Sequence, residues 1–196
     1  MAMELRHIYK NYGEQNIFTN LNLILSEIGF TTIMAPSGYG KTTLVNMILG
    51  ITKPDHGEIM GFDGKYIAAV FQEDRLLEFR SGLENMLFVL RSPTAADIES
   101  AWQLLTQAGL AEDAHKPARE YSGGMRRRLA LCRALLTPFD LLILDEPFKG
   151  LDAALKPAIM AMVKQKCAGK AAILITHDKD EAEFFDSTVI DISNPN

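Results

Sequence analysis

The sequence predicts an α/β fold built on a mostly parallel sheet, with an N-terminal antiparallel β region and an inserted helical subdomain. Uninterrupted apolar runs predict the parallel strands, because strands covered on both faces lack polar alternation. These runs cover residues 31–34, 141–144 and 171–176. A helical pattern follows the first run over about residues 41–49, and Gly50 is typical of a helix end. Strands that alternate with helices favour a parallel sheet with helices on both faces.

Two further stretches depart from this pattern. Residues 5–11 and 16–28 alternate polar and apolar side chains, which indicates antiparallel strands with one solvated face. The β pattern disappears between about residues 75 and 120, and residues 95–108 show helical spacing instead. We therefore expect a single domain in two parts: a sheet-containing core, residues 1–74 and 136–196, and a helical subdomain, about residues 75–135.

Composition narrows the class of protein. The 196 residues are 47% hydrophobic and 23% charged, which is ordinary for a globular domain and excludes disordered, collagen-like and fibrous proteins. No apolar run approaches the length of about 18 residues that a membrane helix needs, and the N-terminus lacks the apolar segment of a secretion signal. Cys132 and Cys167 lie in apolar helical patterns, which indicates buried, reduced thiols. The net charge of −5 disfavours nucleic acid as a partner.

A glycine-containing segment follows the first apolar run, at the end of the predicted strand where parallel sheets bind ligands. Residues 35–40 read Ala-Pro-Ser-Gly-Tyr-Gly, and the next helix opens with Lys-Thr-Thr. Glycines let backbone amides surround a phosphate, and a helix N-terminus adds positive partial charge. The candidate phosphate-binding residues are Ser37, Gly38, Tyr39, Gly40, Lys41, Thr42 and Thr43.

This segment predicts the core of a P-loop NTPase, in which a lysine reaches the β- and γ-phosphates and a hydroxyl holds Mg²⁺. Lys41 and Thr42 occupy those two positions. The strict pattern begins with glycine, and Ala35 stands there instead, which the loop tolerates if φ at Ala35 is negative. The alternative is a glycine-rich turn between a strand and a helix, with a solvated lysine.

A second glycine-containing segment opens a later helix. Residues 121–125 read Tyr-Ser-Gly-Gly-Met, and the helical pattern continues to about Leu136. Ser122 is a sound N-cap, and Gly123 and Gly124 free the first-turn amides to face an anion. A plain capped helix is the alternative. Four arginines on this helix favour a solvated face or a contact within the subdomain over nucleic-acid binding; they are Arg126, Arg127, Arg128 and Arg133.

Acidic and basic residues follow the later predicted strands: Asp145-Glu146-Pro147 after one, and His177 after the next. Taken with the two glycine-containing segments, they resemble the nucleotide-binding subunit of an ABC transporter. The resemblance covers essentially the whole chain, in the family's order. The family's signature reads Leu-Ser-Gly-Gly-Gln, so Tyr121 and Met125 depart from it at both ends. The Ser-Gly-Gly centre, which can present a hydroxyl and N–H groups to a phosphate, is kept.

The resemblance implies a role for each remaining polar residue. Asp145 would bind Mg²⁺ through water, and Glu146 would position and polarise the attacking water. Gln72 matches the glutamine loop that links Mg²⁺ to the membrane partner. His177 would contact the γ-phosphate and hold the water, and Tyr12 lies where the family stacks an aromatic ring on adenine.

Each of these residues also has an ordinary structural explanation. An acidic pair can cap a helix or form a turn, a lone glutamine usually has no special role, and a histidine at a strand end is commonly a satisfied polar residue. Tyr12 can be a strand-edge tyrosine. After the acidic pair, Lys149 stands where the family commonly has serine, and Asp152 would cross a dimer interface or cap the next helix. Pro157 is tolerated only near the start of that helix.

The function that the resemblance implies is ATP hydrolysis that powers transmembrane transport of a small solute. In the family each ATP lies between the phosphate loop of one subunit and the signature of another, which implies a head-to-tail homodimer. The chain would lie in the cytoplasm, peripheral on the inner face of the cell membrane, with transmembrane permease subunits and a solute-binding protein as partners. Residues 72–79 and the helical subdomain would form the docking groove. No pair of cysteines or histidines has zinc-site spacing, so a dedicated metal cage is not indicated. Mg²⁺ would arrive with the nucleotide.

Residues 71–77, Phe-Gln-Glu-Asp-Arg-Leu-Leu, resemble the ATPases of nitrate, sulfonate and taurine importers, which favours import. Two other functions stay open: a soluble ABC-type ATPase not coupled to transport, and a regulatory module that binds nucleotide without turnover. Acidic charge and a short chain disfavour the first. The second is disfavoured by the joint presence of Lys41, Asp145, Glu146 and His177.

Overall fold

The computed structural model describes residues 2–36 and 38–193, and these form two compact units. The first unit contains residues 1–67, 140–145 and 169–196, and the second contains residues 68–139 and 146–168. These units have other bounds than the expected core, residues 1–74 and 136–196, and the expected helical subdomain, about residues 75–135. The expected division stays a prediction.

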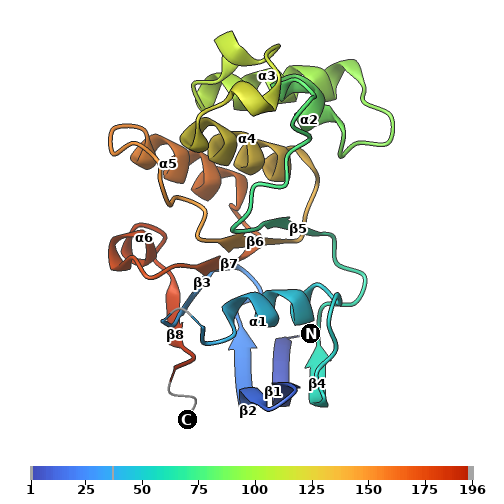
Figure 1. Ribbon diagram of the computed structural model, residues 1–196, viewed down its shortest axis with the longest axis vertical. Coiled ribbons are helices and arrows are strands. Elements are labelled where there is room, and N and C mark those ends of the chain that lie inside the picture. Colours follow the sequence, from blue (N-terminus) through green and yellow to red (C-terminus); the bar gives the residue numbers. More distant parts are fainter. Residues whose placement is uncertain (1, 37, 194–196) are drawn as a thin grey trace. The chain divides into compact units, whose positions relative to one another are not determined.

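One sheet of the first unit is antiparallel, as the polar–apolar alternation predicts. It consists of β1 (Met3–Tyr12), β2 (Gln15–Leu25) and β4 (His56–Met60), in the order β2-β1-β4 (Figure 1). Leu21, Leu23 and Leu25 of β2 are buried, and the residues between them are exposed. This alternation places one face of the sheet in the core of the unit.

The other strands of the first unit are parallel, which confirms the predicted fold class. Their order is β6-β7-β3-β8, and β3 continues into the glycine-containing loop. All residues of the central strands β6 and β7 are buried, as uninterrupted apolar runs require. Because the strands are parallel, their carboxyl ends lie at one edge of the sheet. The bounds are β3 Gly29–Met34, β6 Leu141–Asp145, β7 Ala171–Ile175 and β8 Thr188–Asp191.

Two helices belong to the first unit, α1 (Lys41–Ile48) and α6 (Lys179–Phe184). The apolar residues of α1 are buried, and Gly50 follows it with a φ of +69°, as expected for the residue after a helix end. The side chain of Asp178 caps α6 by accepting from the amide of Asp180 at 2.9 Å. Neither α6 nor β8 was predicted from the sequence, because neither contains a continuous apolar run.

The second unit is mainly helical. Its helix α4 contacts α2, α3 and α5, and the four lie together in Figure 1. Capping boxes start α2 and α3, and Pro157 is tolerated in α5 because it stands in the first turn. No helix within the described part of the chain is long and apolar enough to cross a membrane. The bounds are β5 Ile67–Val70, α2 Gly82–Leu87, α3 Ala95–Gln107, α4 Gly123–Leu136 and α5 Lys156–Lys166, with 3₁₀ turns at Ala111–Asp113 and Ala118–Glu120.

Candidate active site

The loop between β3 and α1 has the backbone that a phosphate-binding loop needs. Gly38 and Gly40 have φ values of +89° and +79°, which side chains other than glycine rarely adopt. The ammonium of Lys41 donates to the carbonyl oxygens of Ala35 at 2.7 Å and Pro36 at 3.0 Å. The Lys41 side chain therefore folds back onto the backbone of its own loop. Ser37 lies outside the described residues.

The start of α1 is open to an anion. Gly38, Tyr39 and Thr42 are exposed, Thr43 is half-buried, and the first turn of α1 contains no acidic residue. The unpaired amides of a helix start and its positive partial charge suit a phosphate group there. Ala35 is not among the described residues with positive φ, so alanine is tolerated at the first position of the loop.

The carboxyl ends of the central strands bring two more candidates to the same edge of the sheet. Asp145 ends β6 and is buried, and it pairs in register with Ile175, the last residue of β7. His177 follows β7 by two residues and is exposed. Tyr12 ends β1, is half exposed, and has the ammonium of Lys10 over its ring at 5.3 Å. These positions agree with the predicted roles, which remain predictions.

In the second unit, the catalytic and signature candidates line one cavity of about 230 Å³. The glutamine loop contributes Gln72, the segment after β6 contributes Glu146, and the start of α4 contributes Gly123 and Gly124. Charged groups and a turn complete the lining, and these residues are Asp74, Arg127, Lys149 and Gly150. Four candidates from three separate segments therefore lie around one space.

Glu146 has an unusual conformation. Its φ is +46°, which is uncommon for a residue with a side chain and is typical of functional sites that store backbone strain. The chain then turns, and the amide of Lys149 donates to the Glu146 carbonyl at 3.3 Å. The Lys149 ammonium also donates to Oε2 of Glu146 at 2.8 Å. This ion pair was not predicted from the sequence.

A buried arginine fixes the backbone around this cavity. Arg127 on α4 is 5% exposed and forms an ion pair with Asp74 at 3.1 Å. Its guanidinium also donates to backbone carbonyls on both sides of the cavity: those of Phe71, Gln72, Glu146 and Pro147. Thus one side chain ties the glutamine loop to the peptide that follows the acidic pair.

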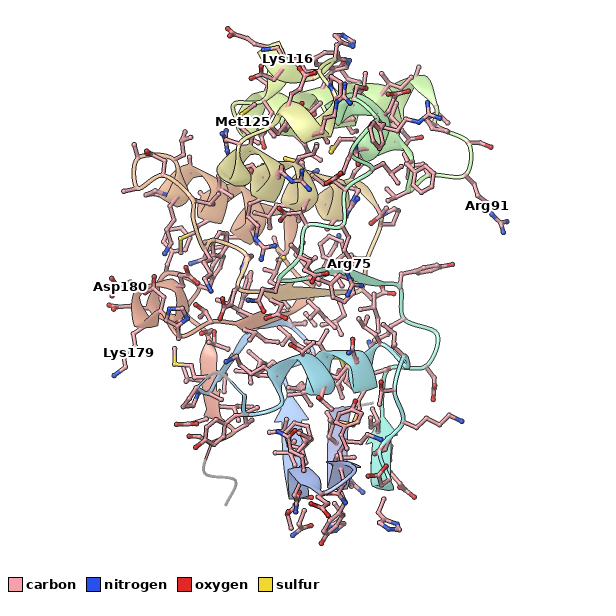
Figure 2. The ribbon with its side chains drawn as sticks, in the orientation of Figure 1. Arg75, Arg91, Lys116, Met125, Lys179 and Asp180 are labelled. Atoms are coloured by element: carbon pink, nitrogen blue, oxygen red, sulfur yellow. The ribbon has the colours of Figure 1, made fainter. Side chains whose placement is uncertain are left out.

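The neighbouring arginines of α4 also serve internal contacts. Arg133 donates to the carbonyls of Asp74 and Arg75, and Arg126 pairs with Glu78 at 3.1 Å. Arg75, labelled in Figure 2, lies with its guanidinium 3.7 Å from the centre of the Phe71 ring. These arginines therefore make contacts within the second unit, some of them to residues outside the expected subdomain.

The signature segment starts α4 as predicted. Ser122 is the N-cap, and its hydroxyl accepts from the amide of Met125 at 3.3 Å (Met125 is labelled in Figure 2). Tyr121 is buried where the family has leucine, and its hydroxyl donates to the carbonyl of Asp113 at 2.7 Å. Burial raises the pKa of Tyr121, so this hydroxyl stays a donor. Tyrosine can therefore replace the family's leucine at position 121, because its hydroxyl has a hydrogen-bond acceptor in the carbonyl of Asp113.

One expectation for the turn after Glu146 is wrong. Asp152 does not cap α5, whose N-cap residue is Leu155 and has no side-chain hydrogen bond. The Asp152 carboxylate instead accepts from the amide of Ala154 at 2.8 Å, so it forms a turn before the helix. Its other predicted role, at a dimer interface, stays a prediction.

The residues present fit Mg²⁺ delivered with a nucleotide. In residues 2–36 and 38–193, no three or more histidine, cysteine, aspartate or glutamate side chains gather as a metal site. Thr42 and Asp145 offer the hydroxyl and carboxylate oxygens that Mg²⁺ prefers, and this ion commonly takes few protein ligands and completes its shell with phosphates and water.

The thiol of Cys132 on α4 is buried. Burial raises the pKa of Cys132 to about 12, so that thiol does not ionise.

A parallel sheet that ends in a glycine-containing loop, with lysine and threonine at the start of the next helix, defines a P-loop nucleotide-binding protein. Residues 18–149 match the family model for ABC transporter. The chain is 33% identical to the taurine import ATP-binding protein TauB of Shigella dysenteriae over 98% of this chain and 80% of that protein. It is 35% identical to the aliphatic sulfonates import ATP-binding protein SsuB 1 of Rhodococcus jostii, over 93% and 75% respectively.

A solved structure agrees with these relatives. The dimeric ATP-binding cassette MJ0796, in a post-hydrolysis state bound to ADP and inorganic phosphate, superposes with a TM-score of 0.84 at 29% identity. The match covers 97% of this chain and 94% of that one. The chain belongs to the ABC transporter family, as one of its ATP-binding, ATP-hydrolysing subunits.

Proposed function

We propose that this protein hydrolyses ATP to power the import of a small solute through separate transmembrane permease subunits. The proposal is supported above all by the cavity in which Gln72 and Glu146 lie together. The proposed catalytic carboxylate and the loop that would sense the membrane partner thus line the same cavity. The similarity to taurine and sulfonate import proteins supports import of a small organic solute.

The phosphate loop and the strand ends would divide the work of catalysis. Lys41 would leave the carbonyls of the loop and pair with the β- and γ-phosphates, and Thr42 and Asp145 would hold Mg²⁺. Bound Mg²⁺ neutralises charge on the phosphates. Glu146 would orient the attacking water, with His177 and Gln72 placing it, and Tyr12 would stack on adenine. Phosphoryl transfer needs mostly such positioning and charge neutralisation.

The signature residues would act on ATP bound to a second copy of the chain. Ser122 already caps α4, and the exposed Gly123 leaves first-turn amides accessible to an anion. The dimeric form of the similar cassette MJ0796 supports a homodimer. We propose that two ATP molecules lie between two copies, and that hydrolysis opens the dimer.

Two exposed phenylalanines on the second unit support docking to a permease. Phe79, which precedes α2, is 79% exposed, and Phe88, at the end of α2, is 70% exposed. Arg119 lies 5.4 Å from the ring centre of Phe79. Aromatic residues are enriched in protein–protein interfaces relative to the rest of the surface. Such docking would hold the protein at the inner face of the cell membrane, and a solute-binding protein would complete the importer.

Replacing the proposed catalytic glutamate tests the ATPase assignment. Glu146→Gln should bind ATP, accumulate as a dimer and hydrolyse ATP at least about 100-fold more slowly, because the amide cannot accept a proton from water. Steady-state phosphate release and size-exclusion chromatography with ATP measure both effects. Glu112→Gln, an exposed position in the same unit, is the control and should behave like the wild type. Hydrolysis by Glu146→Gln at the wild-type rate would contradict the assignment.

A further inference from the structure

The turn that follows β6 places a positive charge directly on the proposed catalytic carboxylate. The left-handed backbone at Glu146 starts the turn, and the hydrogen bond from the Lys149 amide to the Glu146 carbonyl closes it. Arg127 also donates to the same carbonyl, at 2.7 Å. The backbone of both ends of the turn is therefore fixed, and it brings the two side chains together.

The two side chains of the Glu146–Lys149 ion pair differ in their exposure to solvent. The Glu146 side chain is 11% exposed, whereas the Lys149 side chain is 61% exposed. The ammonium of Lys149 therefore approaches the carboxylate from the solvent, at 2.8 Å from Oε2. The other charged groups that line the cavity, Asp74 and Arg127, already pair with each other. Lys149 therefore forms an ion pair with Glu146 at the solvent-facing side of the cavity.

We propose that Lys149 is a positioning residue that restrains Glu146 and slows ATP hydrolysis. This inference rests on the role of Glu146 proposed above. In the reaction a water oxygen bonds to the γ-phosphorus, the bond from that phosphorus to the bridging oxygen breaks, and ADP leaves with the electron pair. The water proton moves toward Glu146, so the carboxylate loses negative charge in the transition state. The pair with Lys149 is therefore stronger in the ground state than in the transition state, and such an interaction lowers the rate.

Removing the ammonium should accelerate the chemical step alone. Lys149→Ala should raise the single-turnover rate of ATP hydrolysis about two- to fivefold, the range expected for an ion pair open to solvent on one side. KM for ATP should stay within about twofold, because Lys149 is not among the proposed ATP ligands. Lys149→Arg keeps the charge and should retain the wild-type rate.

Two controls separate this role from a structural one. Lys166→Ala removes an exposed lysine from the same unit and should leave the rate unchanged. In a Glu146→Gln background, Lys149→Ala should have no effect on the residual rate, because the charge on which Lys149 acts is gone.

The outcomes distinguish the two proposals. A rate for Lys149→Ala equal to or below that of the wild type, or acceleration by Lys149→Arg as large as by alanine, would overturn the role of Lys149 and leave the ATPase intact. Hydrolysis by Glu146→Gln at the wild-type rate would instead overturn the proposed function of Glu146, and the role of Lys149 with it.

Discussion

Two glycines give the loop between β3 and α1 a backbone that other residues rarely adopt. They differ in their surroundings: a Cβ at Gly38 would meet open space, whereas a Cβ at Gly40 would lie 2.5 Å from Cγ2 of Ile17 and 2.7 Å from Cζ of Phe18. Both neighbours belong to β2, so the loop packs against the antiparallel sheet of the same unit. The glycine pattern in the sequence predicted the loop, but not this contact, because no local signal connects residues so far apart in the chain.

This difference predicts unequal effects of alanine at the two positions. Both substitutions should cost about 1–2 kcal/mol of folding free energy, because each forces a left-handed backbone onto a residue with a Cβ. Gly40→Ala should lose about 1–3 kcal/mol more from its clash with β2, and ATP binding with it. Urea unfolding and ATP titration measure both. Equal destabilisation by Gly38→Ala and Gly40→Ala would contradict the packing described here.

At the scale of secondary structure, the bounds of α4 followed from local signals. The serine N-cap, the two glycines and the spacing of apolar residues predicted a helix from residue 122 to about 136, and α4 spans Gly123–Leu136. The burial of Arg127 could not be predicted in this way. Its partners lie between 19 and 56 residues away along the chain, and an arginine in a basic run usually faces solvent. The same limit applies to Lys149, whose partner depends on the backbone angles at Glu146.

The burial of Arg127 predicts a large effect on stability. Arg127→Met should lower the free energy of unfolding by about 3–5 kcal/mol, because it leaves the Asp74 carboxylate and several carbonyls without their donor. Asp74→Asn should cost less, about 1–2 kcal/mol, because the guanidinium keeps its backbone acceptors. Chemical denaturation of the whole chain measures both values. A loss below about 1 kcal/mol for Arg127→Met would show that the network contributes little.

At the scale of the whole molecule, the α/β class and the parallel sheet were predictable because buried strands leave continuous apolar runs. The strand order was not, and β8 was missed because most of its residues are exposed. The candidate site residues were proposed one by one from motifs and from the family resemblance, and their roles stay predictions. The structure adds that Gln72 and Glu146 line the same cavity, which sequence motifs do not show. The proposed link between the ATPase and a membrane partner depends on the exposed surface of the second unit.

Affinity purification of this ATPase from detergent-solubilised membranes tests whether it works on a membrane permease. The wild type should retain a multi-span membrane protein. A Phe79→Ser/Phe88→Ser variant should lose that protein while still hydrolysing ATP, because only its exposed apolar surface has changed. Ile24→Ser, at a 71% exposed position in the first unit, should retain it. If the wild type retained soluble partners but no membrane protein, the proposed coupling to a permease would be wrong. That result would favour a soluble ATPase that is not coupled to transport.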